Sequence, residues 1–243
     1  LSELALGGTA VGTGINTKAQ FGPHMAKEIT RFTGISFVEA SNHFEAQGAQ
    51  DAAVETSGAL KTVAVSLSKI ANDIRWLGSG PRAGLGELIL PAVQPGSSIM
   101  PGKTNPVICE AMIQACAQVI GNDLAITIGG QGGVFELNLM LPLIAHNLTN
   151  SITILSNGTI VFTEKLIIGL KANKEKCAGY IEGSLAMCTS LAPVIGYDKA
   201  ADIAYKAYNS GKTVREIAIE ENVLDKDKLN ELLDPLSMTK PSK

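Results

Sequence analysis

The stretch from Gly96 to Glu110 gathers several side chains that could do chemistry. It holds two serine hydroxyls, one ammonium group, one amide and one carboxylate, and Pro101 and Pro106 prevent a regular helix before its last residues. A serine can act as a base when nearby positive charge and backbone N–H groups stabilise its alkoxide. Unpaired N–H groups at a helix start, with Lys103 close by, favour a small carboxylate. The stretch therefore predicts a loop that binds a carboxylate and moves a proton.

Three segments resemble a known family. The run from Gly96 to Pro106 resembles the signature loop of the fumarase/aspartase superfamily, whose members eliminate a group from the carbon β to a carboxylate and leave a fumarate. Residues 78–91 and the glycine-rich segment 7–16 resemble class II fumarases in particular. The resemblance covers essentially the whole chain. It implies a fumarate hydratase of the tricarboxylic acid cycle, which adds water reversibly and in the anti sense to fumarate and gives L-malate.

The resemblance also implies a role for the polar side chains of this loop. It implies that Ser97 takes the C–H proton of the substrate, and that Lys103 and Asn105 hold the carboxylate whose charge grows in the transition state. It places Ser98 and Thr104 in the same substrate pocket. The substrate is then a small dicarboxylate, and no cofactor and no metal ion are expected.

Glu110 belongs to the other half of the implied reaction. In the family the matching carboxylate orients a histidine from another segment, on the acid side of the reaction. His24, His43 and His146 all lie in different sequence contexts, so we expect the base half of the site without the acid half. We therefore expect little or no activity from the 243-residue chain alone. The structural alternative for Glu110 is a solvated carboxylate favoured at a helix start.

Other readings of the loop are an aspartate ammonia-lyase, a catalytically silent scaffold and a plain connector. Aspartases tend to have Ala at the position of Gly102, and both enzyme families usually have Val at the position of Thr104, so this chain departs from both there. A silent helical scaffold would resemble the lens crystallins of this superfamily. The intact Ser97, Lys103 and Asn105 argue against a scaffold for the whole protein, while a scaffold stays a fair description of the 243-residue fragment. A glycine- and proline-rich connector, with Ser and Lys only capping turns, is the purely structural alternative.

Composition narrows the class of protein. With 45% hydrophobic and 18% charged residues, a 243-residue chain can bury a sizeable core. A formal net charge of -3 gives no electrostatic case for nucleic acid or an anionic membrane surface, and we expect no apolar span long enough for a membrane. The cysteines lack metal-ligand spacing and are expected to be reduced thiols, which favours the cytoplasm or, in a eukaryote, the mitochondrial matrix. They are Cys109, Cys116, Cys177 and Cys188.

Long helices are expected to position the loop. Apolar residues at helical spacing predict a helix over 47–77, whose wide apolar face needs several partners. Asn105 as N-cap, followed by a proline, predicts a second helix over 106–129. A third is predicted over 135–168, with a kink at Pro142.

The beginning of the chain gives weaker signals. A helix is predicted over 19–32, with Thr17 as its cap and Gly34 as its stop. Residues 1–6 have the composition of a helix end, from which we expect the C-terminal part of a longer protein.

These elements predict an all-α fold, a long-helix bundle with a small C-terminal helical domain. Residues 1–172 form the partial central bundle that carries the loop, and residues 173–243 form the small domain. The resemblance implies a homotetramer whose sites are shared between subunits. Short helices are expected in the small domain over 174–191, 198–209, 213–221 and 226–233, with Asp198 and Thr213 as caps and a poorly ordered tail from Pro235.

Overall fold

The computed structural model describes residues 1–241 except 81, 95, 97–98 and 103–104. Its regular structure is almost entirely helical, and each described strand is two residues long, so the predicted all-α class is confirmed. The chain divides into two compact units, residues 1–77 with 90–170 and residues 78–89 with 171–243. The second unit thus includes residues 78–89, which the sequence pattern places in the first domain.

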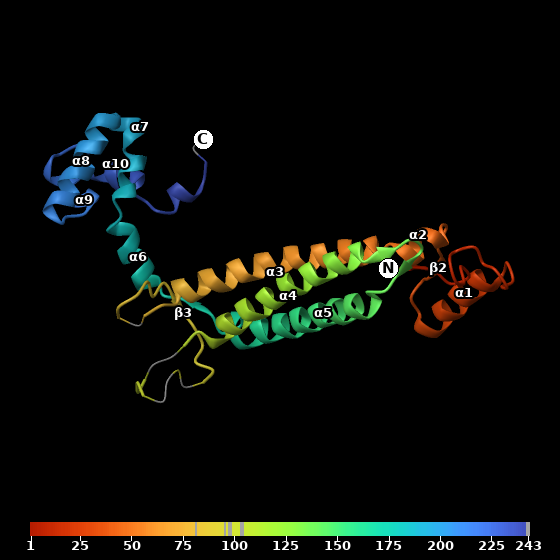
Figure 1. The fold of residues 1–243 in the computed structure, drawn as a ribbon. Coiled ribbons are helices and arrows are strands. Elements are labelled where there is room, and N and C mark those ends of the chain that lie inside the picture. The colour runs from red at the N-terminus through yellow and green to blue at the C-terminus, as the bar shows by residue number, and fades with distance from the viewer. Residues whose placement is uncertain (81, 95, 97–98, 103–104, 242–243) are drawn as a thin grey trace. The chain divides into compact units, whose positions relative to one another are not determined.

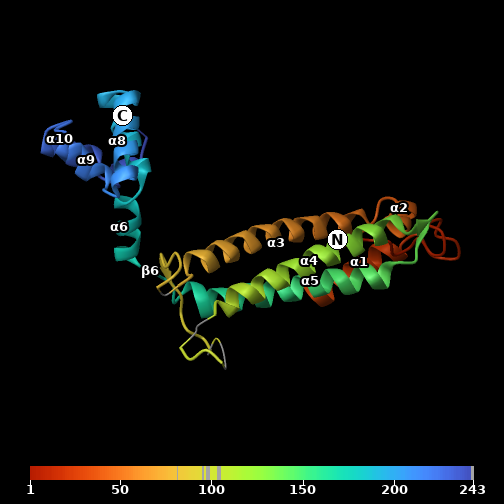
Figure 2. The ribbon, with the colours of Figure 1, turned by 60° about the vertical axis from the view of Figure 1, so that its left-hand side comes forward.

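Three long helices form the body of the first unit. They are α3 (Asp51–Leu77), α4 (Val107–Gln131) and α5 (Leu141–Phe162), which lie side by side in both views (Figures 1 and 2). Helix α4 lies between the other two and contacts both along its length. Their apolar faces meet in a buried cluster made of Ala53, Ile126, Ile144 and Leu148.

A buried polar network ties these three helices together. Ser57 Oγ of α3 donates to Asp123 Oδ1 of α4 over 2.8 Å, and Lys61 Nζ donates to Asp123 Oδ2 over 2.5 Å. On the other side of α4, Asn122 Nδ2 donates to Ser151 Oγ of α5 over 3.0 Å. Because buried polar groups need partners, these bonds fix the rotation of α4 against both neighbours.

Helix α4 is strongly apolar along its length. By length and composition alone it could cross a membrane, with a mean hydropathy of 1.2 over an 18-residue window. Asp123 interrupts its apolar sequence, so it is not an unbroken apolar span of about 20 residues. The core helix of a bundle has the same composition, and the buried Asp123 carboxylate, which pairs with Lys61, supports a core helix here.

The predicted helix over 47–77 is broken near its start. Helix α2 (His43–Gly48) ends before α3 begins at Asp51. The Asn42 side chain caps α2 by accepting hydrogen bonds from the backbone N–H groups of Phe44 and Glu45. This cap starts a separate short helix, which the apolar spacing of the longer stretch does not reveal.

The predicted helix over 135–168 is also corrected. A hairpin of β4 (Gly133–Val134) and β5 (Leu137–Asn138) occupies its first residues, and α5 begins only at Leu141. Pro142 falls in the first turn of α5, where the missing N–H costs nothing, so no kink forms there. A π-helix over Thr163–Ile167 follows α5 directly.

The N-terminal region differs from its prediction in two places. Strand β1 (Glu3–Leu4) pairs in parallel with β2 (Val38–Glu39), so the interpretation of residues 1–6 as a helix end is wrong. Helix α1 (Phe21–Thr33) has Gln20 rather than Thr17 at its cap position. It ends as predicted at Gly34, whose φ of 74° is a left-handed conformation that glycine adopts readily.

The second unit has its own apolar core, a buried cluster that includes Leu191, Ile203 and Leu229.

The predicted helix caps of this unit are borne out in part. The cap Thr213 is confirmed, because its side chain and that of Glu216 bond reciprocally to backbone N–H groups in a capping box. Asp198 lies in the first turn of its helix, and Gly196 takes the cap position instead. The elements are β3 (Leu88–Ile89) paired antiparallel with β6 (Lys171–Ala172), α6 (Lys174–Glu182), a 3₁₀ turn (Leu185–Ser190), α7 (Ala192–Ile195), α8 (Tyr197–Ser210), α9 (Val214–Glu220), α10 (Lys226–Leu232) and a final 3₁₀ turn (Ser237–Thr239).

Candidate functional site

The candidate site begins where the loop enters α4. Pro106, with φ -79° and ψ 55°, is the cap residue of this helix, and the first helical residue is Val107. The prediction of Asn105 as N-cap is therefore wrong. Its side chain bonds elsewhere, since Nδ2 donates to the Gly96 carbonyl oxygen over 2.8 Å. This bond joins the two ends of residues 96–105, the stretch that carries the predicted base Ser97.

Four predicted site residues lie outside the described residues. These are Ser97, Ser98, Lys103 and Thr104. Their roles stay predictions, and the described part of the segment supplies the geometry around them. The Asn105 bond to Gly96 is the part of that geometry that bears on them directly, because it holds the residues that flank all four.

Gly102 bears on the choice between the two enzyme families. Its φ of 78° lies in the left-handed region, where a residue with a Cβ is strained. No atom of the described residues lies within 4 Å of the place that a Cβ would take, so the constraint seen here is that of the backbone conformation. An alanine, as aspartases tend to have there, would not suit this turn.

Glu110 lies in the first turn of α4 and is half-buried. Its backbone N–H donates to the Pro106 carbonyl over 3.1 Å. Among the described residues its carboxylate has no hydrogen bond or ion pair. His24 and His146 are exposed, and His43 Nε2 lies 3.2 Å from both Glu39 Oε1 and the Leu6 carbonyl oxygen.

Arg75 was not singled out by sequence reasoning, yet its charge acts at the start of α4. Its guanidinium is close enough to lower the pKa of Cys109, while Glu110 raises it. Burial has the largest effect and raises the pKa of the Cys109 thiol to about 11. In the sequence, this role of Arg75 is indicated only by its position in the last turn of α3, the helix that precedes the loop.

The cysteines differ in their expected reactivity. Cys109, Cys116 and Cys188 are buried, and burial raises the pKa of each thiol, whereas Cys177 is partly exposed. At pH 8, a thiol with a pKa of about 11 is about 0.1% thiolate, roughly a hundredfold less than a thiol with the ordinary pKa of 9.0. We expect N-ethylmaleimide to modify Cys177 first, as measured by mass spectrometry of the native chain. Equal modification of Cys109 and Cys177 would contradict this.

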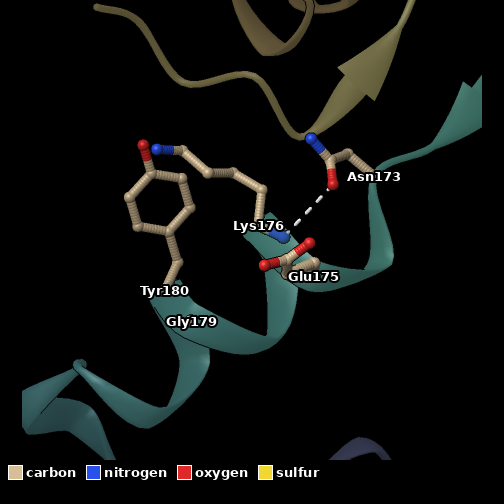
Figure 3. Close-up of a pocket in the computed structure, with 5 residues that line it drawn as sticks. All are labelled: Asn173, Glu175, Lys176, Gly179 and Tyr180. Carbon is tan, nitrogen blue, oxygen red and sulfur yellow. Dashed lines mark hydrogen bonds between the residues drawn. The ribbon is translucent and has the colours of Figure 1, made fainter. Parts of the chain in front are cut away.

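A hollow of about 550 Å³ lies on α6 in the second unit (Figure 3). The described residues that line it include Lys176, whose ammonium lies 5.2 Å from the centre of the Tyr180 ring, and Asn173, whose side chain caps the helix. None of the predicted site residues is among its lining residues.

Comparison with known proteins points to one family. A sequence model described as Lyase matches residues 1–121, and one described as Fumarase C C-terminus matches residues 187–240. A mitochondrial fumarate hydratase of Danio rerio is 52% identical over 239 residues, which are 98% of this chain and 47% of that protein. A class II fumarate hydratase of Xylella fastidiosa is 51% identical over 98% of this chain and 50% of its own length.

Solved structures agree with these sequence matches. The crystal structure of a recombinant class II fumarase from Schistosoma mansoni superposes with a TM-score of 0.94 at 38% identity, over 100% of this chain and 54% of that one. The chain spans about half the length of the relatives it matches.

Proposed function

Because the chain belongs to the class II fumarase family, we propose that it supplies the base half of a fumarate hydratase site. The observation that carries this proposal is the intact segment from Gly96 to Glu110, which lies within the match to the family model. The bond from Asn105 to Gly96, which closes residues 96–105 of this segment, supports the proposal.

In the dehydration direction the proposed steps are as follows. The Ser97 alkoxide takes a proton from the carbon next to one carboxylate of L-malate, and the electron pair moves into that carboxylate. Lys103, Asn105 and backbone N–H groups stabilise the extra negative charge. The electrons then form the double bond and expel hydroxide, which leaves as water once the acid side donates a proton. Glu110 orients the acid-side histidine, which no described residue of this chain provides.

A chimera tests this proposal directly. Residues 1–243 would replace the matching half of the Danio rerio enzyme, and the absorbance of fumarate would follow its hydration. We expect turnover on the order of 10 s⁻¹ or more from the chimera, and little or none from the 243-residue chain alone. An inactive chimera that is folded would favour the silent scaffold. Fumarate released from aspartate rather than malate would favour the ammonia-lyase, which the φ of Gly102 disfavours.

The family is oligomeric, and we infer a homotetramer with shared sites. Helix α4 carries a second apolar stripe at four-residue spacing, in which Ile120, Leu124 and Ile128 are 41%, 62% and 51% exposed. Further copies of the chain would cover this surface.

We infer a location in the cytoplasm or the mitochondrial matrix. Relatives at about this level of identity include mitochondrial proteins and bacterial class II proteins. The described cysteines are free thiols, which suits a reducing compartment.

A further inference from the structure

The hollow on α6 brings two opposite charges together without pairing them. Its volume of about 550 Å³ lies within the range of roughly 300 to 1,000 Å³ that small-molecule sites occupy. Its described lining contains one ammonium group, from Lys176, and one carboxylate, from Glu175. Among the residues that the structure describes, neither of these two groups forms an ion pair. The hollow therefore offers one charge of each sign to a ligand.

The Lys176 ammonium is held in place by its surroundings. It lies 5.2 Å from the centre of the Tyr180 ring, which is a cation–π contact, and Figure 3 shows both side chains across the hollow from Asn173. The Tyr180 hydroxyl donates to the Gly84 carbonyl oxygen over 3.2 Å, which fixes the ring. A Cβ on Gly86 would lie 3.9 Å from Lys176 Cε, so the chain at Gly86 lies close to the lysine stem. A positive charge that is fixed beforehand lowers the entropic cost of binding.

The first turn of α6, which carries Glu175, is also fixed. Asn173 Oδ1 accepts a hydrogen bond from the Lys176 backbone N–H over 3.3 Å, and the Asn173 backbone N–H donates to the Glu87 carbonyl oxygen over 2.8 Å. Cys177 Sγ donates to the same carbonyl oxygen over 3.6 Å. Because Glu87 directly precedes β3, these bonds tie the start of the helix to a segment of the same unit. Both charges thus have a firm support.

The lining favours a ligand that carries both signs of charge. A dicarboxylate would meet Glu175 as well as Lys176, and a simple cation would meet Lys176, so each would face repulsion from one of them. A free amino acid presents its carboxylate to Lys176 and its ammonium to Glu175. No atom of the described residues, apart from the backbone of the helix itself, lies within 4 Å of the place that a Cβ on Gly179 would take, and Tyr180 beside it is 42% exposed. Room and aromatic surface therefore remain for an apolar side chain.

We infer that the hollow on α6 binds a free α-amino acid with an apolar side chain. Lys176 binds its carboxylate, Glu175 binds its ammonium, and the Tyr180 ring contacts its side chain. The inference does not rest on the proposed hydratase reaction, whose substrate is a dicarboxylate. A failed assignment of the reaction would change turnover in the chimera and leave amino-acid binding to the hollow as it is.

L-Leucine is the probe, and saturation-transfer NMR measures its binding to the 243-residue chain. We expect a Kd on the order of 1 mM, because the hollow opens to solvent, which screens its charges. Two analogues test the need for both charges. 4-Methylpentanoate lacks the ammonium and 3-methylbutylamine lacks the carboxylate, so each should bind at least about tenfold more weakly than leucine. Saturating L-malate should not displace leucine.

Variants place the binding in the hollow. Lys176→Met and Glu175→Gln each remove one of the two charges, so each should weaken leucine binding at least about tenfold. Lys174→Met is the matched control, because Lys174 is an exposed lysine of the same helix that is not part of the described lining. It should leave the Kd within about twofold. Circular dichroism checks that each variant keeps its helices.

Four results would overturn the inference. They are leucine binding that does not saturate below about 50 mM, an analogue that binds as tightly as leucine, displacement of leucine by malate, and an equal loss of binding in the Lys174→Met control. If the chain alone is unfolded by circular dichroism, the same titrations in the chimera decide the matter.

Discussion

Replacing Ser97 by Ala in the chimera should lower kcat by about a thousandfold and change KM by little more than about twofold. The reason is that the proposed proton transfer occurs only in the transition state, so the hydroxyl contributes little to binding the ground state. Steady-state kinetics of fumarate hydration and of malate dehydration would measure both constants.

Ser98→Ala is the control for this variant. It removes a neighbouring hydroxyl that is proposed to line the pocket, so it should raise KM more than it lowers kcat. A Ser97→Ala chimera with nearly normal kcat would remove Ser97 as the base. Equal losses in kcat from both variants would instead indicate that the loop tolerates neither substitution.

The long helices could be predicted from sequence because their apolar spacing persists over many turns. The start of α4 was predicted to within one residue, since Pro106 cannot lie within a helix. The breaks were harder to predict. Asn42 caps a helix of only six residues, and the apolar spacing continues across the gap between Gly48 and Asp51. The strand pair at the N-terminus rests on contacts between residues 35 positions apart, which no local pattern contains.

The candidate site was predictable in its residue types and less so in its geometry. Asn105 has the residue type of a cap, but its Nδ2 donates to the carbonyl of Gly96, nine positions earlier, and Pro106 takes the cap position. Such a contact depends on how the loop closes, which local propensity does not encode. The sequence pattern predicts a helix where the hairpin around Phe135 lies, and the reason is similar. Its sequence has apolar residues at helical spacing, and the glycine contacts that hold it come from α2.

Replacing Lys61 by Met should lower the free energy of unfolding by about 2 to 3 kcal/mol, measured by urea denaturation at a fixed protein concentration. The Asp123 side chain is 7% exposed, and Lys61 Nζ lies 2.5 Å from its Oδ2. Without the ammonium, the Ser57 hydroxyl is the one partner that the buried carboxylate keeps among the described residues. The Lys61 side chain is 44% exposed, which places the effect below that of a fully buried pair.

Lys69→Met is the matched control on the same helix. Lys69 pairs with Asp73, and their side chains are 73% and 46% exposed, so its loss should cost less than about 0.5 kcal/mol. The double variant Lys61→Met with Asp123→Leu should recover most of the stability lost in the single variant, because it removes the stranded charge as well as its partner. If the double variant were less stable than Lys61→Met alone, desolvation of the carboxylate would not be the cause. The network would then owe its stability to side-chain shape rather than to charge.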